Sequence, residues 1–139
     1  MIASLGNFTL WLSLCFAVLQ FVVSYKKNVT SLLRFNKIAV QGLLLCTLIS
    51  FACLIYSHIV SDFSVLNVFQ NSHTTKPLLY KISGVWGNHE GSMLLWVVVL
   101  TIFNYFIYNL YNQKNSIFIS KALETQAFIT IGFLLFTLL

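Results

Sequence analysis

The residues best suited to chemistry lie between positions 61 and 92, the longest polar stretch of the chain. Within this stretch His89 and Glu90 are adjacent, in the run Trp-Gly-Asn-His-Glu-Gly-Ser that starts at position 86. A zinc-protease motif, His-Glu-x-x-His, would need its second histidine at position 93, which is Met93. The pair therefore does not predict a zinc hydrolase. His89 alone could ligate haem iron, and His89 and Glu90 together could hydrogen-bond a partner loop.

A structural role accounts for the same residues. A carboxylate at the start of a helix is stabilised by the positive end of the helix dipole, and a serine there can cap free backbone N–H groups. We therefore interpret His89, Glu90 and Ser92 first as caps of the helix that follows. Trp86, His89 and Glu90 are the candidates for a surface that binds a partner or handles haem. The sequence predicts no catalytic residue and no metal site.

Other residues offer less. His58, near the end of an apolar stretch, could be an axial haem ligand, but we expect its ring to reach the membrane interface instead. Lys121 and Glu124, three residues apart, are expected to pair on one helix face. The cysteines form no haem-attachment motif and are interpreted as small buried residues: Cys15, Cys46 and Cys53.

The composition requires a membrane around these residues. Of the 139 residues, 58% are hydrophobic and only 8% are charged, whereas a soluble domain is roughly one quarter charged. Eight Lys and Arg residues give a net charge of +5, but they are scattered between apolar stretches and form no basic face for nucleic acid. The chain is therefore predicted to be an all-α, polytopic membrane protein.

A helix needs about 20 apolar residues to cross a bilayer. Three stretches clearly qualify and a fourth is expected to be only partly complete: residues 8–25, 38–60, 93–111 and 117–139. Small and polar residues within them are expected to pack helices together: Gln41, Gly42, Asn104 and Asn109. We treat residues 1–139 as one membrane segment.

The loop at residues 61–92 is predicted to contain an amphipathic helix in the membrane surface. Pro77 suits its first position, with Thr74 or Thr75 as the cap. Basic residues are enriched in loops on the cytoplasmic side. This loop has two basic residues. Six lie in or beside the first and third connections: Lys26, Lys27, Arg34, Lys37, Lys114 and Lys121. The N-terminus and residues 61–92 are therefore expected on the outer side.

Four blocks of the sequence resemble successive blocks of the N-terminal part of the CcmF family, the haem lyase subunit of cytochrome c maturation. The blocks are GNFTLWLSLCFAVLQ, DFSVLNVFQNS, KPLLYKISGVWGNHEGSMLLW and GFLLFTLL, from Gly6 to the last residue. The most specific part is Val-Trp-Gly-x-His-Glu-Gly-Ser at Val85 to Ser92. The family's tryptophan-rich haem-handling motif has no counterpart here, so the resemblance transfers no catalytic residue.

The resemblance implies a multi-pass protein of the mitochondrial inner membrane or the bacterial plasma membrane, which helps to transfer haem from a haem chaperone to apocytochrome c. The implied partners are the remainder of the haem lyase, other cytochrome c maturation proteins, the chaperone and apocytochrome c. Haem is expected in the assembled complex and not stably on this chain alone. This chain alone is expected to be a non-catalytic scaffold and partner surface.

The chain stops fifteen residues after Glu124, which suggests a split gene or a truncated copy of the family. A second interpretation is a small subunit of a membrane transporter or respiratory complex. That class would be expected to place ionisable residues deep in its spans. Only Glu124 is a candidate for such a residue, and it lies near the start of its stretch.

Overall fold

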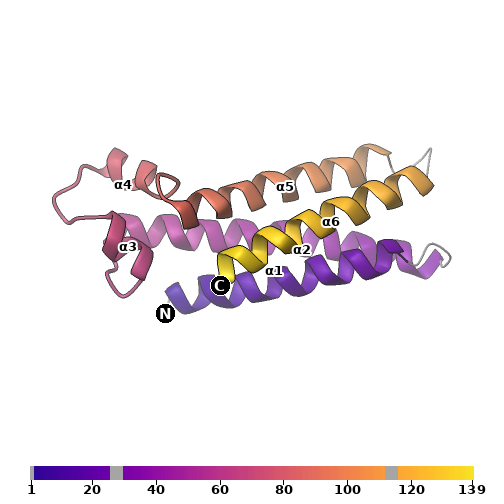
Figure 1. Cartoon of the computed structure of the whole chain (residues 1–139), viewed down its shortest axis with the longest axis horizontal. Coiled ribbons are helices and arrows are strands. Elements are labelled where there is room, and N and C mark those ends of the chain that lie inside the picture. Colours follow the sequence, from indigo (N-terminus) through magenta and orange to yellow (C-terminus); the bar gives the residue numbers. More distant parts are fainter. Residues whose placement is uncertain (1, 26–29, 112–115) are drawn as a thin grey trace.

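The computed structural model describes residues 2–25, 30–111 and 116–139, which form six α-helices. Four of them are long, and two short helices lie between the second and third long ones (Figure 1). In chain order the helices are α1 (Ile2–Tyr25), α2 (Thr30–Val60), α3 (Leu66–Asn71), α4 (Leu78–Gly84), α5 (His89–Tyr111) and α6 (Ser116–Leu138).

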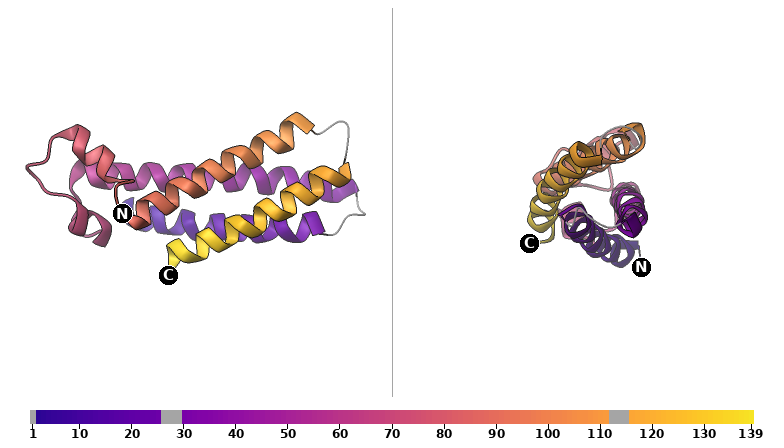
Figure 2. Two further views of the ribbon diagram at one scale, coloured as in Figure 1. Left: turned by 45° about the horizontal axis from the view of Figure 1, so that its top comes forward. Right: turned by 90° about the vertical axis from the view of Figure 1, so that its right-hand side faces the viewer.

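The four long helices run antiparallel to their neighbours and form a closed bundle. The pairs in contact are α1 with α2, α2 with α5, α5 with α6, and α6 with α1. Seen end on, α1 and α2 lie on one side and α5 and α6 on the other (Figure 2). The N-terminus, the C-terminus, α3 and α4 all lie toward one end of the bundle (Figure 1). We call this the α3–α4 end.

The bundle places small and polar residues inside and large apolar residues outside. In α1 the buried residues recur every three or four positions: Gly6, Thr9, Ser13, Ala17, Gln20, Val23 and Ser24. Large side chains of the same helix are exposed, among them Phe8, Trp11 and Val22. Such an arrangement is stable in lipid, because apolar side chains can face the lipid tails without cost and small residues let helices approach closely. All four long helices are long and apolar enough to cross a membrane.

Apolar contacts between the helices complete the interior. One cluster joins all four helices through Ala17, Leu43, Val97 and Leu134. Gly42 lies against the ring of Phe16, and a side chain at this position would clash with that ring. The packing role expected for Gly42 is thereby confirmed.

The observed helices are longer than the predicted spans at several ends. The first begins at Ile2 instead of residue 8, and the third begins at His89 instead of residue 93. The second begins at Thr30, although its membrane candidate starts at Phe35. The fourth, expected to be partly complete, provides a 22-residue candidate span from Ile117 to Leu138. Polar residues can extend a membrane helix past the hydrocarbon, so hydropathy underestimates its length.

The loop helix predicted after Pro77 is present as α4, but its cap was predicted wrongly. Pro77 is itself the N-cap residue, and no described side chain forms a cap hydrogen bond with this helix. Helix α3 was not predicted, because its six residues are too few to give a periodic pattern. The N-terminus and this loop share one end of the bundle, as the predicted topology requires (Figure 1). Of the basic residues behind that topology, Lys26, Lys27 and Lys114 lie outside the described residues.

Candidate functional site

The segment Val85–Ser92 starts α5 through a cap that differs from the predicted one. Oδ1 of Asn88 accepts a hydrogen bond of 2.7 Å from the backbone N–H of Gly91, three positions later. Asn88 is therefore the N-cap residue of α5. The Ser92 hydroxyl donates instead to the carbonyl of His89 at 2.9 Å. The N-cap is therefore none of the predicted residues, His89, Glu90 and Ser92. The expected place of the Glu90 carboxylate in the first turn of this helix is confirmed.

Asn67 of α3 joins this segment to the rest of the loop. Its amide and that of Asn88 donate to each other, with both N–O distances 3.0 Å. Nδ2 of Asn67 also donates to Oε2 of Glu90 at 2.8 Å. A second bond from Asn88 reaches the carbonyl of Gly84 at the end of α4, at 3.0 Å. One polar network thus holds α3, the end of α4 and the start of α5 together.

Glycine is required at position 91 because the backbone passes so close to it. A Cβ atom there would overlap the carbonyl oxygen of Val85. Val85 is fully buried and Gly91 is buried as well, so neither side of this turn can move outward easily. The glycine therefore allows the chain to fold back from α4 into α5.

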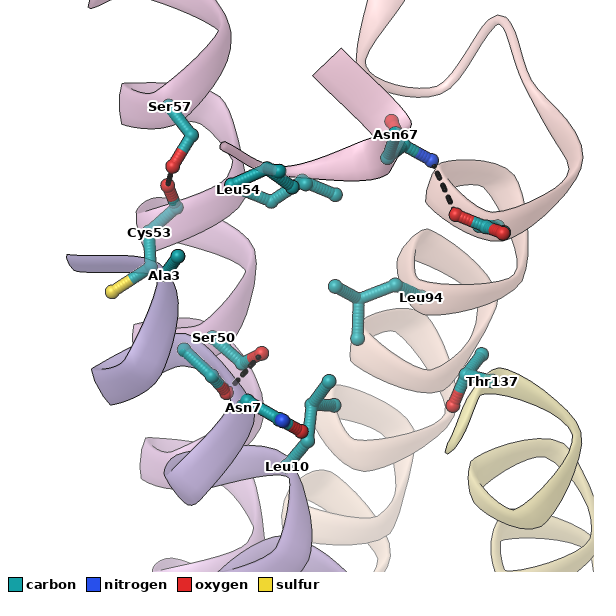
Figure 3. Close-up of a pocket in the computed structure, with 13 residues that line it drawn as sticks. Ala3, Asn7, Leu10, Ser50, Cys53, Leu54, Ser57, Asn67, Leu94 and Thr137 are labelled. Atoms are coloured by element: carbon teal, nitrogen blue, oxygen red, sulfur yellow. Dashed lines mark hydrogen bonds between the residues drawn. The ribbon is translucent and has the colours of Figure 1, made fainter. Parts of the chain in front are cut away.

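A cavity of about 300 Å³ lies beside this network, between α1, α2, α3, α5 and the end of α6 (Figure 3). Leu10, Leu54 and Leu94 supply apolar wall. Oxygen-bearing side chains supply much of the remainder: Asn7, Ser50, Ser57, Asn67, Glu90 and Thr137. Among the described residues that line the cavity, Glu90 is the one that carries a charge, so it dominates the electrostatics there.

The three predicted site residues are only partly brought together. Glu90 is held by Asn67 and lines the cavity, although the residue as a whole is exposed. Trp86 is 42% exposed, and the His89 side chain is also exposed. Neither Trp86 nor His89 lines the cavity. Trp86 and His89 therefore face outward at the α3–α4 end, while Glu90 belongs to the polar network and the rim of the cavity.

His58 is buried in the protein, although its ring was expected to extend toward the membrane interface. Its side chain is fully buried, and Nδ1 donates to the carbonyl of Leu54 at 3.1 Å. Within the described residues Nε2 has no hydrogen-bond partner. Helix α4 packs on α2, and Lys81 of α4 donates to the hydroxyl of Ser61, which directly follows α2. Cys15 also differs from expectation, because it is exposed on the bundle surface.

A second polar pair lies deep in the bundle. Gln20 of α1 and Asn104 of α5 exchange two hydrogen bonds, of 3.0 and 2.7 Å, and Gln20 also donates to the carbonyl of Leu123 in α6 at 3.1 Å. The interhelical role predicted for Asn104 is confirmed, and Gln20 was missed. Asn109 was predicted wrongly, because it is exposed and, among the described residues, its side chain bonds to Tyr105 of its own helix. For Gln41, no hydrogen bond is found in the part of the chain that the structure describes.

Some charged groups elsewhere have local partners. Lys121 and Glu124 form the predicted ion pair, with 3.1 Å between Nζ and Oε2. The hydroxyl and backbone N–H of Ser64 donate to Asp62 and lower the pKa of its carboxyl below the ordinary value. Within residues 2–25, 30–111 and 116–139, no three His, Cys, Asp or Glu side chains are grouped so that they could hold a metal ion.

Known proteins resemble this chain over nearly its whole length. The cytochrome c-type biogenesis protein CycK of Rhizobium meliloti is 41% identical over 100% of the chain, and that of Bradyrhizobium diazoefficiens is 42% identical over 99%. CcmF of Haemophilus influenzae is 36% identical over 99%. A solved structure of the cytochrome c haem lyase CcmF superimposes with a TM-score of 0.88, at 27% identity over 96% of the chain.

The matched regions are only part of the relatives. The chain spans 21% of each CycK protein, 22% of the Haemophilus CcmF and 23% of the solved CcmF chain. No protein-family model matches it. Full coverage of the chain at this identity and the shared fold nevertheless agree on its family. The chain is a homologue of the N-terminal part of the CcmF and CycK cytochrome c-type biogenesis proteins.

Proposed function

We propose that the chain acts in cytochrome c biogenesis as the N-terminal membrane portion of a haem lyase. The observation that carries this proposal is the match of the whole chain to CcmF and CycK proteins in both sequence and fold. In this role the chain is a scaffold and a partner surface that helps haem pass from a haem chaperone to apocytochrome c. Haem belongs to the assembled complex in this proposal.

The described residues favour the scaffold role over a catalytic one. Of the three histidines, His58 is buried, whereas His73 and His89 are exposed in the loop. Axial ligands must approach an iron from opposite faces of one macrocycle, and the described cavity is lined by no histidine. The proposed partners of the chain are therefore the remainder of the lyase, which supplies the haem pocket, and the other maturation proteins.

The exposed pair Trp86 and His89 is the proposed contact for such partners at the α3–α4 end. An exposed indole offers a large apolar face with a donor, and an imidazole offers a hydrogen bond. We place this end on the outer side of the bacterial plasma membrane or the mitochondrial inner membrane. The basic residues near the opposite connections support that orientation.

The alternative role, a small subunit of a transporter or respiratory complex, lacks a comparable observation. It would be favoured by ionisable groups lining a path through the spans. Glu124, its one candidate from the sequence, is instead paired with Lys121.

Removal of the chain from cells tests the proposed function. We expect c-type cytochromes to lose covalent haem, detected by haem staining of denaturing gels, while b-type haem in the same membranes stays normal. Complementation with Trp86→Ala or His89→Ala should lower holocytochrome c at matched protein level, and Gln70→Ala, an exposed change on α3, should not. Normal covalent haem after complete loss of the chain would rule the proposal out.

A further inference from the structure

The cavity beside Glu90 is rich in hydrogen-bond acceptors. The hydroxyl of Ser50 donates to the carbonyl of Gly6 at 3.1 Å, and that of Ser57 to the carbonyl of Cys53 at 2.9 Å. Thr137 likewise donates to Leu134 at 2.9 Å. Since each hydroxyl hydrogen is already used, these groups present only lone pairs to the cavity, as does the carboxylate of Glu90.

We propose that this cavity receives the side chain of an arginine or a lysine from a part of the haem lyase outside these 139 residues. The inference rests on the proposed function and specifies the partner of this site. A guanidinium carries five N–H donors and an ammonium three, with no acceptor on either, which suits the lone pairs of these hydroxyls and of the Glu90 carboxylate. Leu10, Leu54 and Leu94 suit the apolar stem of such a side chain (Figure 3).

Glu90 can bind a cation through its second carboxylate oxygen, and no cationic side chain of the described residues is found there. Asn67 fixes Oε2 from one side, which leaves Oε1 for another donor. The two lysines of the same loop are engaged elsewhere: Lys76 Nζ donates to the carbonyl of Asn71 at 2.9 Å, and Lys81 Nζ to the hydroxyl of Ser61 at 2.7 Å. Among the described residues the ion pair found joins Lys121 and Glu124.

Covering the cavity without a cation would be costly. Glu90 is exposed in this chain by itself, so its carboxylate is hydrated until other protein covers it. A carboxylate removed from water needs a charged or strongly hydrogen-bonding partner. The relatives are about five times longer than this chain, so protein that lies outside it is available to cover this end of the bundle. A phospholipid is a weaker candidate, because the phosphate of its head group repels a carboxylate.

Photo-crosslinking in the native membrane, with the complete lyase present, tests the inference. Leu54 is replaced by benzoylphenylalanine, and the crosslinked peptides are identified by mass spectrometry. We expect a lyase peptide from outside residues 1–139 that carries Arg or Lys near the crosslink. Glu90→Gln keeps the size of the side chain and should lower the yield of this peptide at least about tenfold. Glu124→Gln, the same change at a carboxylate that already has a partner, should leave the yield within about twofold.

Exchange of the two charges, between Glu90 and the identified basic residue, distinguishes loss of the contact from misfolding of a single variant. Glu90→Lys should abolish the crosslink, and reversal of the identified basic residue to Glu should restore it. The inference would be overturned by an adduct with lipid or by adducts only within this chain. It would also be overturned if Glu90→Gln left the crosslink yield unchanged. These results differ from failure of the proposed function, in which no lyase peptide would be recovered from any position, including the exposed Phe128.

Discussion

At the scale of single residues, the turn from α4 into α5 depends on the absence of a side chain at Gly91. In Gly91→Ala the new Cβ would overlap the carbonyl oxygen of Val85, and this buried backbone cannot move aside without disturbing the turn. We expect a loss of at least about 2 kcal/mol in the free energy of unfolding, measured by denaturant titration in mixed micelles.

Gly132→Ala is the matched control for that substitution. Its Cβ would meet nothing within 4 Å, and Ala favours a helix by about 1 kcal/mol over Gly. This variant should be as stable as the parent or slightly more stable. Equal stability of the two variants would mean that residues 85 and 91 are not as close as described.

Near this turn the sequence indicated the right segment but not the contacts within it. Glu90 was singled out as a charge beside a helix start, and it does occupy the first turn of α5. Asn67 and Asn88, which hold it, were overlooked because amides in a loop are common and pairing across 21 positions leaves no local pattern. A lone Asn between Leu66 and Val68 was the available signal, since a buried amide in an apolar run needs a partner.

At the scale of helices, the Gln20–Asn104 pair predicts a thermodynamic coupling between α1 and α5. Gln20→Leu or Asn104→Leu alone leaves a buried amide without its partner, and each should cost about 1–2 kcal/mol in unfolding free energy. The double variant should cost less than the sum of the two, with a coupling of roughly 0.6–1.7 kcal/mol.

Asn109→Leu is the control for this cycle, because Asn109 is exposed and its bond found among the described residues stays within its own helix. It should change stability by less than about 0.5 kcal/mol. Strict additivity of the two buried substitutions would show that the pair does not connect the helices.

Hydropathy located all four long helices, because an apolar stretch of about twenty residues is long enough to cross a bilayer. Their ends were less predictable, since polar residues such as His89 and Glu90 continue α5 beyond the apolar run. The interior contacts were also beyond reach of the sequence. The small and polar residues of a uniformly apolar helix decide which of its faces turns inward. The partner of Gln20 could be identified only in the structure, where α5 brings Asn104 to it.

At the scale of the whole molecule, the sequence predicted the membrane class because eleven charged residues cannot solvate 139. The structure adds that the N-terminus and the α3–α4 segment share one end of the bundle (Figure 2). Which side of the membrane this end faces is proposed from basic residues near the other connections. His58 shows the limit of such reasoning, since it is fully buried although it lies near the end of an apolar stretch.

The orientation predicts opposite thiol accessibility for two exposed positions. After the native cysteines are replaced, His73→Cys in the loop should react with an impermeant maleimide added from the outer side of intact cells or organelles. Lys37→Cys, near the start of α2, should react only after the membrane is opened. The reverse pattern would invert the proposed topology.

We propose that this chain works as the N-terminal part of a cytochrome c haem lyase, and the most direct test of this proposal is exchange with a relative. Residues 1–139 should replace the matching 21% of the Rhizobium meliloti CycK protein in cells that lack the native protein. We expect the chimera to restore covalent haem on c-type cytochromes, measured by haem staining, and to lose this ability with Gly91→Ala. A chimera that is inserted and folded at the level of native CycK, yet yields no holocytochrome c, would contradict the claim.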